Sequence, residues 1–186
     1  MTRNLPNLLT AGRLALVPVI AVQVLRGNFR LALVLTFLAG LTDVVDGFLA
    51  RHFGWGSRLG AWLDPLADKA LLVTLFLTLG WVGAFPWWLV VLVFARDAVI
   101  LLMVGAAFAF TAIRDFPPSV WGKLSTFVQV GSCFGVMVIR STPFTWPAAV
   151  GVFLVAATAL VTVWSGIDYV RLGVNRWRRE RASQAR

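Results

Sequence analysis

The stretch DVVDGFLARHFGWGSRLGAWLDPLAD, from Asp43 to Asp68, decides the fold of this chain. It places four aspartates, Asp43, Asp46, Asp64 and Asp68, inside segments that otherwise have the apolar composition of membrane-spanning helices. One ionised carboxylate at the centre of a bilayer costs about 2.5–3.5 kcal/mol on insertion scales. Four uncompensated carboxylates would cost about 10 kcal/mol, so we expect cations to neutralise them.

The spacing of these aspartates places them on two helical faces. Asp43 and Asp46 are three residues apart and Asp64 and Asp68 are four apart, so each pair shares one face of a helix. Two antiparallel helices joined by a short turn near residues 52–57 would bring the two pairs to face each other around one pocket. Small residues and one arginine accompany the aspartates on these helices: Gly47, Ala50, Arg51 and Gly60.

A site lined by four carboxylates favours a hard divalent cation. Oxygen-only ligands suit Mg²⁺ or Mn²⁺. Two such ions can hold a diphosphate and both oxygens of an in-line displacement. The glycines and the alanine leave room for a bulky ligand, and Arg51 suits a phosphate oxygen. The pattern therefore predicts a two-metal site that handles a phosphorylated substrate.

The composition is that of an integral membrane protein. Of the 186 residues, 59% are hydrophobic and only 13% are charged, whereas a soluble domain carries about 25% charged residues. The mean hydropathy is +0.82. The net charge of +9 comes from basic residues that flank apolar runs, which excludes nucleic-acid binding in favour of contacts with lipid headgroups. We expect residues 1–186 to form a single all-α membrane domain.

The apolar runs predict six transmembrane helices that follow a short N-terminal interfacial segment. Residues 1–10 form that polar segment, and the basic tail from 171 to 186 is expected to lie on the membrane surface as a short helix. The spans are expected over residues 8–25, 31–51, 59–80, 87–110, 119–139 and 148–167.

The arginines predict the orientation of these spans. Six spans place both termini on one side, together with ten arginines, against Arg26, Arg30 and Arg140 on the other side. By the positive-inside rule both termini are cytoplasmic, and so is the turn between the two aspartate pairs. A soluble substrate would reach the site from the cytoplasm, and the cell inner membrane is the expected location.

Polar residues near the cytoplasmic ends of other spans are candidates for binding the phosphate of an acceptor. Thr10 and Arg13 share one face of the first span, and Lys123 and Thr126 share one face of the fifth, while Arg114 lies in the loop before it. The alternative is that Arg13 and Lys123 only extend along the apolar surface toward water.

Adjacent charges in the fourth span give a further prediction. Arg96 and Asp97 are neighbours in a helix and do not face each other, so each is expected to have a separate partner.

The chain resembles a known family at the residues that open this section. The pattern D-x2-D-G-x2-A-R-x8-G-x3-D-x3-D, the signature of the CDP-alcohol phosphatidyltransferases, is matched at every fixed position. NLPNLLTAGR at 4–13 and GKLSTFVQ at 122–129 are similar to the phosphatidylglycerophosphate synthases and the CMP-forming cardiolipin synthases of that family. The positions that match the signature are Asp43, Asp46, Gly47, Ala50, Arg51, Gly60, Asp64 and Asp68.

The resemblance implies a reaction and an assembly. Members of the family transfer a phosphatidyl group from CDP-diacylglycerol to an alcohol and release CMP, using Mg²⁺ or Mn²⁺. They fold as six transmembrane helices and usually form homodimers. In this sequence Asp43, Asp46, Asp64 and Asp68 would hold the metals, and Asp68 would also be the general base for the acceptor hydroxyl. The residues implied to contact the CDP-lipid are Asp43, Gly47, Ala50, Arg51 and Gly60.

The resemblance leaves the acceptor alcohol open. Gly122 and the WSGIDY segment at Trp164–Tyr169 favour glycerol 3-phosphate, whereas the adjacent Arg96 and Asp97 resemble the cardiolipin synthases, which use phosphatidylglycerol. We take glycerol 3-phosphate as the first choice and phosphatidylglycerol as the second. A transporter or divalent-cation channel is the alternative from another class, but an ion pathway would not require glycines, an alanine and an arginine at these fixed offsets.

Overall fold

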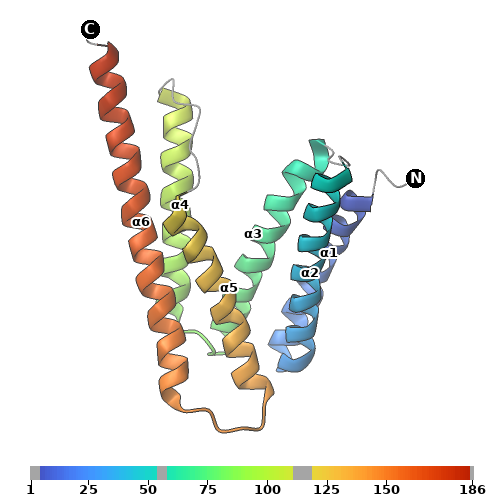
Figure 1. The fold of residues 1–186 in the computed structure, drawn as a ribbon. Helices are drawn as coiled ribbons and strands as arrows, with labels where there is room; N and C mark the ends of the chain where they lie inside the picture. The colour runs from blue at the N-terminus through green and yellow to red at the C-terminus, as the bar shows by residue number, and fades with distance from the viewer. Residues whose placement is uncertain (1–4, 54–57, 111–118, 185–186) are drawn as a thin grey trace. The chain divides into compact units, whose positions relative to one another are not determined.

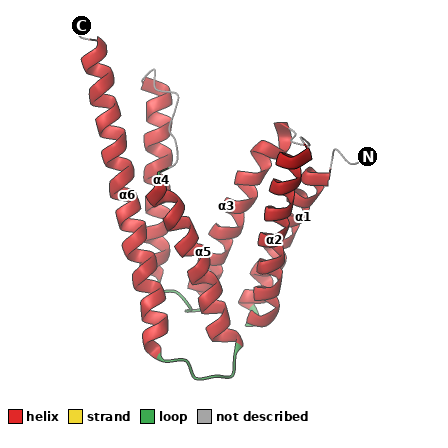
Figure 2. Cartoon of the chain, viewed as in Figure 1, coloured by secondary structure: helices red, strands yellow, loops and turns green. Residues whose placement is uncertain are grey.

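A computed structural model gives the structure of the protein. It describes the backbone of residues 5–53, 58–110 and 119–184, and the side chains of residues 10–45, 66–106 and 119–174. Within these ranges the chain is helical and contains no strand (Figure 2). The helices, labelled in Figure 1, are α1 (Leu5–Leu25), α2 (Phe29–Phe53), α3 (Arg58–Trp81), α4 (Trp87–Phe110), α5 (Val120–Ser141) and α6 (Ala148–Gln184).

The all-α prediction is confirmed, and two helix bounds differ from the expected ones. α1 already begins at Leu5, so much of the expected N-terminal segment belongs to the first helix. α6 continues to Gln184, so the prediction of a separate surface helix in the tail is wrong. The sequence has no proline after Pro147, and the arginines, alanines and glutamate of the tail are good helix formers, so nothing ends α6 at the end of the apolar run.

Two glycines end helices in the same way. Gly27 follows α1 with φ of 76°, and its N–H donates to the carbonyl of Val24 at 3.0 Å while Asn28 donates to Gln23 at 2.9 Å. Gly83 follows α3 with φ of 68° and closes the same pair of bonds. This left-handed cap satisfies the last carbonyls of each helix and suits glycine, which has no Cβ to clash.

The chain divides into two compact units. The first consists of Met1–Phe85 and Cys133–Trp146, and the second of Pro86–Ser132 and Pro147–Arg186. In the first unit, α1 packs along both α2 and α3 (Figure 1). Ala32 and Ala39 of α2 are fully buried, as are Ile20 and Val24 of α1. Small residues on one helix let a neighbouring helix approach closely, which is how helices pack in lipid.

Two arginines join chain segments at one end of the first unit. Arg30 donates to the carbonyl of Ser141 at 2.8 Å, and Arg140 donates to the carbonyl of Gly83 at 3.1 Å. The start of α2, the end of α5 and the turn after α3 therefore meet there. Arg30 is thirteen residues before Asp43 in α2, so this end lies about 20 Å along the helix from the first aspartate.

In the second unit, α4 packs on α6, and polar side chains join α5 to α6. Gln129 donates to the hydroxyl of Thr162 at 3.1 Å, and the hydroxyl of Thr158 donates to that of Ser132 at 2.7 Å. All four side chains are buried. Such bonds between helices are favourable in an apolar medium because an unpaired polar group there has no water to bind.

Three helices are long and apolar enough to cross a membrane. These segments, found in the part of the chain whose side chains are described, are Trp87–Ala106, Val120–Ser141 and Ala148–Val174. The described side chains of α1 form a further apolar stretch, Thr10–Leu25. The six predicted spans thus correspond to six helices, of which three have the length and composition of a span within the described residues.

Candidate active site

The site in the first unit is built around Arg13, the only charged residue of α1. Its side chain is 1% exposed and faces the two helices that α1 packs against. Thr10, one turn earlier on the same face, is also buried. A buried guanidinium requires acceptors or anions close by, because an isolated charge is strongly disfavoured away from water.

Those anions are an aspartate from each neighbouring helix. Nη1 of Arg13 lies 2.6 Å from Oδ1 of Asp43 in α2. The same nitrogen donates to Oδ1 of Asp68 in α3 at 2.7 Å. Both carboxylate oxygens contact one atom, so they lie no further apart than the sum of these two distances. The first aspartate of the motif and the last are therefore brought together, as their spacing predicts.

The equal depth of the two aspartates results from the helix bounds. Asp43 lies ten residues before the end of α2, and Asp68 lies ten residues after the start of α3. At 1.5 Å per residue, both are about 15 Å from the ends that the motif turn connects. The two helices run in opposite directions, so their acidic residues meet at one level.

α1 adds a partner that the spacing of the aspartates does not predict. In the first unit α1 packs against α2 and against α3 and supplies the guanidinium that joins Asp43 to Asp68. Arg13, expected to bind an acceptor phosphate, is thus a direct partner of the predicted metal ligands.

Both aspartates remain accessible although their partner is buried. The side chain of Asp43 is 41% exposed and that of Asp68 is 54% exposed, against 1% for Arg13. Each carboxylate has about four lone-pair positions, so oxygens that contact Arg13 on one side can accept ligands on the other. This donor set fits a divalent cation, because carboxylates from two helices already converge on a positive charge.

The other predicted site residues fall outside this description or in the second unit. Among the described side chains, no group of three or more histidine, cysteine, aspartate or glutamate residues could hold a metal. The six remaining motif positions all lie on α2 and α3, but the side chains at these positions lie outside the described part of the chain, as does all of Arg114. These motif positions are Asp46, Gly47, Ala50, Arg51, Gly60 and Asp64.

The candidates on α5 lie on its exposed side. The side chains of Lys123 and Thr126 are exposed, whereas Ser125 and Gln129 are buried toward α6. The hydroxyl of Thr126 donates to the carbonyl of Gly122 at 3.2 Å, within its own helix. Gln129, which the sequence makes a weaker candidate for the acceptor phosphate, is buried and donates to Thr162 between two helices of the second unit.

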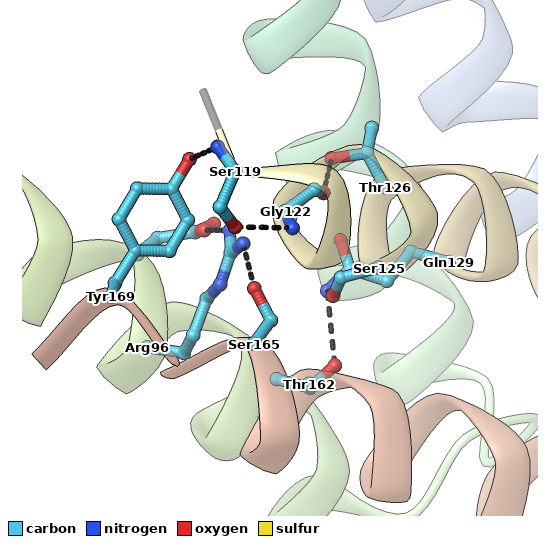
Figure 3. A network of polar contacts seen from close by, with 10 residues as sticks. Arg96, Ser119, Gly122, Ser125, Thr126, Gln129, Thr162, Ser165 and Tyr169 are labelled. Atoms are coloured by element: carbon cyan, nitrogen blue, oxygen red, sulfur yellow. Dashed lines mark hydrogen bonds and ion pairs between the residues drawn. The ribbon is translucent and has the colours of Figure 1, made fainter. Parts of the chain in front are cut away.

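A second polar network surrounds Arg96 in the second unit (Figure 3). Its guanidinium donates to Oδ1 of Asp97 at 2.9 Å and to the hydroxyl of Ser165 in α6, and it lies 5.6 Å from the centre of the Tyr169 ring. Arg96 thus has separate partners, as predicted, but it also pairs with Asp97, which the prediction that the two do not face each other did not allow for. Arginine is long enough to fold back along its own helix, although the Cβ atoms of adjacent residues point in different directions.

The ring of Tyr169 also explains the glycine at the start of α5. Ser119 precedes the helix and its hydroxyl accepts from the N–H of Gly122 at 3.0 Å, which is an N-cap bond. The backbone N–H of Ser119 donates to the hydroxyl of Tyr169 at 3.3 Å. A Cβ on Gly122 would lie 2.8 Å from the tyrosine ring and hydroxyl. A larger residue at this position would therefore require the ring of Tyr169 or the start of α5 to move (Figure 3).

The fold and site define an integral membrane protein that gathers aspartates from two helices around one cation. The sequence model of the family described as CDP-alcohol phosphatidyltransferase matches residues 3–164 of this chain. The chain belongs to the CDP-alcohol phosphatidyltransferase family, as its motif predicts. This membership makes it an enzyme, and it removes the reason to consider a transporter or channel.

Relatives with two kinds of name are similar along most of the chain. A probable phosphatidylglycerophosphate synthase of Mycobacterium tuberculosis is 36% identical over 175 residues, which cover 90% of this chain and 80% of that protein. A cardiolipin synthase (CMP-forming) of Rattus norvegicus is 33% identical over 174 residues, covering 92% of this chain and 55% of that protein. A cardiolipin synthase (CMP-forming) of Streptomyces coelicolor is 36% identical over 133 residues, 67% of this chain and 60% of that protein.

Sequence reasoning missed that Arg13 binds the aspartates. A signal was available, because Arg13 is the only charged residue in the first helix and the two following helices carry acidic residues. A lone cation in an apolar helix is expected to find the nearest intramembrane anions. The sequence does not indicate which helices pack against each other. In the structure α1 packs against both acidic helices, α2 and α3.

Proposed function

We propose that the protein transfers the phosphatidyl group of CDP-diacylglycerol to glycerol 3-phosphate and releases CMP, as a phosphatidylglycerophosphate synthase. The observation that carries this choice of acceptor is the match to the mycobacterial protein of that name, which extends over 80% of its length. The chain covers a smaller share, 55–60%, of the rat and Streptomyces proteins named cardiolipin synthase.

The proposed reaction is an in-line displacement at phosphorus. The acceptor hydroxyl oxygen forms a bond to the phosphorus that carries the diacylglycerol, and the bond from that phosphorus to the CMP oxygen breaks. CMP leaves with the bonding electron pair, and the hydroxyl proton passes to a carboxylate oxygen of Asp68. The exposed fraction of Asp68, 54%, supports this role, because a general base must lie within hydrogen-bond reach of the hydroxyl.

A pair of Mg²⁺ or Mn²⁺ ions would be held by Asp43, Asp46, Asp64 and Asp68 and, when bound, would neutralise the diphosphate of the CDP-lipid. The short contacts of two of these aspartates with the Arg13 guanidinium support a site built for positive charge. The residues proposed to lie against the CDP-lipid are Asp43, Gly47, Ala50, Arg51 and Gly60.

Basic and hydroxyl side chains are proposed to bind the acceptor. Glycerol 3-phosphate is a small dianion, so several donors should converge on its phosphate. Arg13 with Thr10, Lys123 with Thr126, and Arg114 are the candidates. The position of Arg13 beside Asp68 supports its part in this set, because the acceptor phosphate and the base must lie near one another.

We further propose that all six helices cross the cell inner membrane, with both termini and the site on the cytoplasmic side, and that two copies form a homodimer. The distribution of arginines supports the orientation. Reaction of single introduced cysteines with an impermeant reagent in intact cells and in open vesicles would test the orientation, and cross-linking in the membrane would test the dimer.

A cardiolipin synthase that uses phosphatidylglycerol is the second candidate. The rat protein's 33% identity over 92% of this chain favours it. Phosphatidylglycerol carries one negative charge and would enter from the membrane, so it needs fewer cationic donors.

One assay separates the two functions. The purified protein receives CDP-diacylglycerol and Mg²⁺ or Mn²⁺ with each acceptor alone, and lipid products and CMP are measured. We expect phosphatidylglycerophosphate from glycerol 3-phosphate. Cardiolipin from phosphatidylglycerol, with no product from glycerol 3-phosphate, would show that the second candidate is correct.

A further inference from the structure

Arg13 occupies the position at which the proposed function requires a divalent cation. We infer that the Arg13 guanidinium and the divalent cation exclude each other at Asp43 and Asp68, so that cation loading displaces the guanidinium from the aspartates and frees it for an anionic phosphate. The inference rests on the proposed function, because it concerns the cation and the phosphate of that same site.

The exclusion results from the geometry of three atoms. Nη1 of Arg13 is 2.6 Å from Oδ1 of Asp43 and 2.7 Å from Oδ1 of Asp68. A Mg²⁺ ion bound by these oxygens would lie about 2.0–2.1 Å from each. It would use the lone pairs that now face the guanidinium and would stand beside a like charge at contact distance. A cation that bridges these two Oδ1 atoms therefore cannot bind while Nη1 of Arg13 lies between them, although the remaining lone pairs stay open to other ligands.

The burial of Arg13 determines where a displaced guanidinium can go. Arg13 is 1% exposed, and a guanidinium in such a buried position favours an anion close by. The phosphate of a substrate that binds at the neighbouring cation is such an anion, and arginine matches its geometry with two parallel hydrogen bonds. Arg13 would then exchange its contacts with Asp43 and Asp68 for contacts with the phosphate.

The exchange predicts that the cation and the anion favour each other's binding. The cation removes the aspartates from Arg13, and the phosphate takes their place, so each ligand lowers the free energy of binding the other. A permanent structural role for Arg13 predicts the reverse. If Arg13 only holds Asp43 and Asp68 in place, its removal should spoil the cation site and weaken cation binding.

The two roles therefore give opposite signs in one measurement. Mn²⁺ binding to the purified full-length protein, without lipid substrate, is measured by electron paramagnetic resonance of free Mn²⁺. We expect Arg13→Gln to bind Mn²⁺ about tenfold more tightly than wild type, within the usual range of coupling between ligands. Arg26→Gln is the matched control, since it removes the same charge from an exposed position just after α1 and should leave the affinity unchanged.

A second measurement on the wild-type protein avoids dependence on the folding of Arg13→Gln. In protein labelled with ¹⁵N-arginine, Mg²⁺ should shift the guanidinium signals of Arg13 at the same concentrations at which it binds. The signals are assigned by their loss in Arg13→Lys, which keeps the positive charge. Signals of Arg13 that stay unchanged at saturating Mg²⁺ would overturn the inference.

The outcomes also separate this inference from the proposed function. Mn²⁺ binding by wild type, with equal or weaker binding by Arg13→Gln, would show that Arg13 does not compete with the cation and would leave the metal site in place. Failure of the wild-type protein to bind Mn²⁺ would contradict the cation in the proposed function, and the inference would fall with it.

Discussion

Each unit of the molecule contains an arginine that is largely buried and paired with an aspartate, but the aspartates differ in their surroundings. In the first unit Arg13 is 1% exposed, while its partners Asp43 and Asp68 are 41% and 54% exposed. In the second unit Arg96 and Asp97 are 11% and 10% exposed. The first arrangement leaves carboxylate oxygens open to ligands, and the second encloses its carboxylate.

The two arginines also differ in which helices supply their partners. Asp43 and Asp68 come from two helices, and Arg13 of a third helix contacts both of them. Arg96 binds its own neighbour, a serine hydroxyl of α6 and the face of Tyr169. A buried charge whose partners lie on helices that pack against each other stabilises the fold. Open carboxylates beside a buried cation are instead suited to bind and release ligands.

The largest expected effect comes from removing a carboxylate of the first unit. Asp43→Asn or Asp64→Asn should reduce Mg²⁺- or Mn²⁺-dependent turnover by at least about 100-fold, because loss of mere outer partners of a metal site already costs about 10–100-fold. The variants should still insert into the membrane. Release of CMP from CDP-diacylglycerol by the purified variants measures the effect, and EDTA should abolish wild-type activity reversibly.

Asp97→Asn is the matched control for that comparison. It makes the same chemical change in the second unit, where the aspartate partners Arg96. We expect a lower midpoint of thermal unfolding in detergent and a smaller loss of turnover in the folded fraction. If Asp43→Asn kept full activity while Asp97→Asn lost it, the assignment of chemistry to the first unit would be wrong.

A finer test separates the two aspartates of the first unit from each other. Asp68 is proposed to accept the proton of the acceptor hydroxyl, and general bases contribute about 10²–10⁴-fold to rate. Asp68→Asn should therefore lower kcat by that order while the protein still binds CDP-diacylglycerol. Steady-state kinetics with a direct lipid-binding assay would check this. An unchanged kcat with weaker lipid binding would make Asp68 a ligand only.

The next smaller effect is on the binding of the acceptor alcohol rather than on the rate of the chemical step. Arg13→Ala or Lys123→Ala should raise the KM for glycerol 3-phosphate about 10- to 100-fold, the value of one hydrogen bond to a charged group. The KM for CDP-diacylglycerol should change far less. Measuring the KM for glycerol 3-phosphate and the KM for CDP-diacylglycerol in each variant tests whether these residues bind the acceptor. Arg26→Ala is the control at an exposed position. Equal changes in both KM values would remove that residue from the acceptor site.

Much of this structure is predictable from sequence because its signals are local. Apolar runs, glycines and prolines predict where the helices lie, and the three- and four-residue spacing of the aspartates predicts that Asp43 and Asp68 meet. In the tail, the high charge predicts a separate surface segment, but helix propensity continues α6 to Gln184 instead.

The rest depends on contacts between distant segments. Arg13 and Asp68 are 55 residues apart, and the pairing requires α1 to pack on both acidic helices, which no local pattern indicates. The packing of Tyr169 on Gly122 joins α6 to α5 in the same way. The pairing of Arg96 with Asp97 is not predicted for a different reason, since the directions of Cβ atoms do not limit where a long flexible side chain ends.

The smallest expected effect tests whether the network of the second unit is structural. In Gly122→Ala the new methyl group would lie 2.8 Å from the ring of Tyr169, so the ring or the start of α5 must move. Overpacking of this kind costs about 1–3 kcal/mol, and the midpoint of thermal unfolding in detergent should fall. Tyr169→Phe removes only the acceptor of the 3.3 Å bond from Ser119 and should cost about 1 kcal/mol or less.

The double variant makes this last test specific. Tyr169→Ala removes the ring, so adding Gly122→Ala to it should cause little further loss of stability, whereas the same change in wild type should cause the full loss. Mn²⁺ binding should be unchanged in all these variants, because Gly122 and Tyr169 belong to the enclosed network and not to the open aspartates. Additive losses in the double variant would mean that Gly122 is required for a reason other than the tyrosine ring.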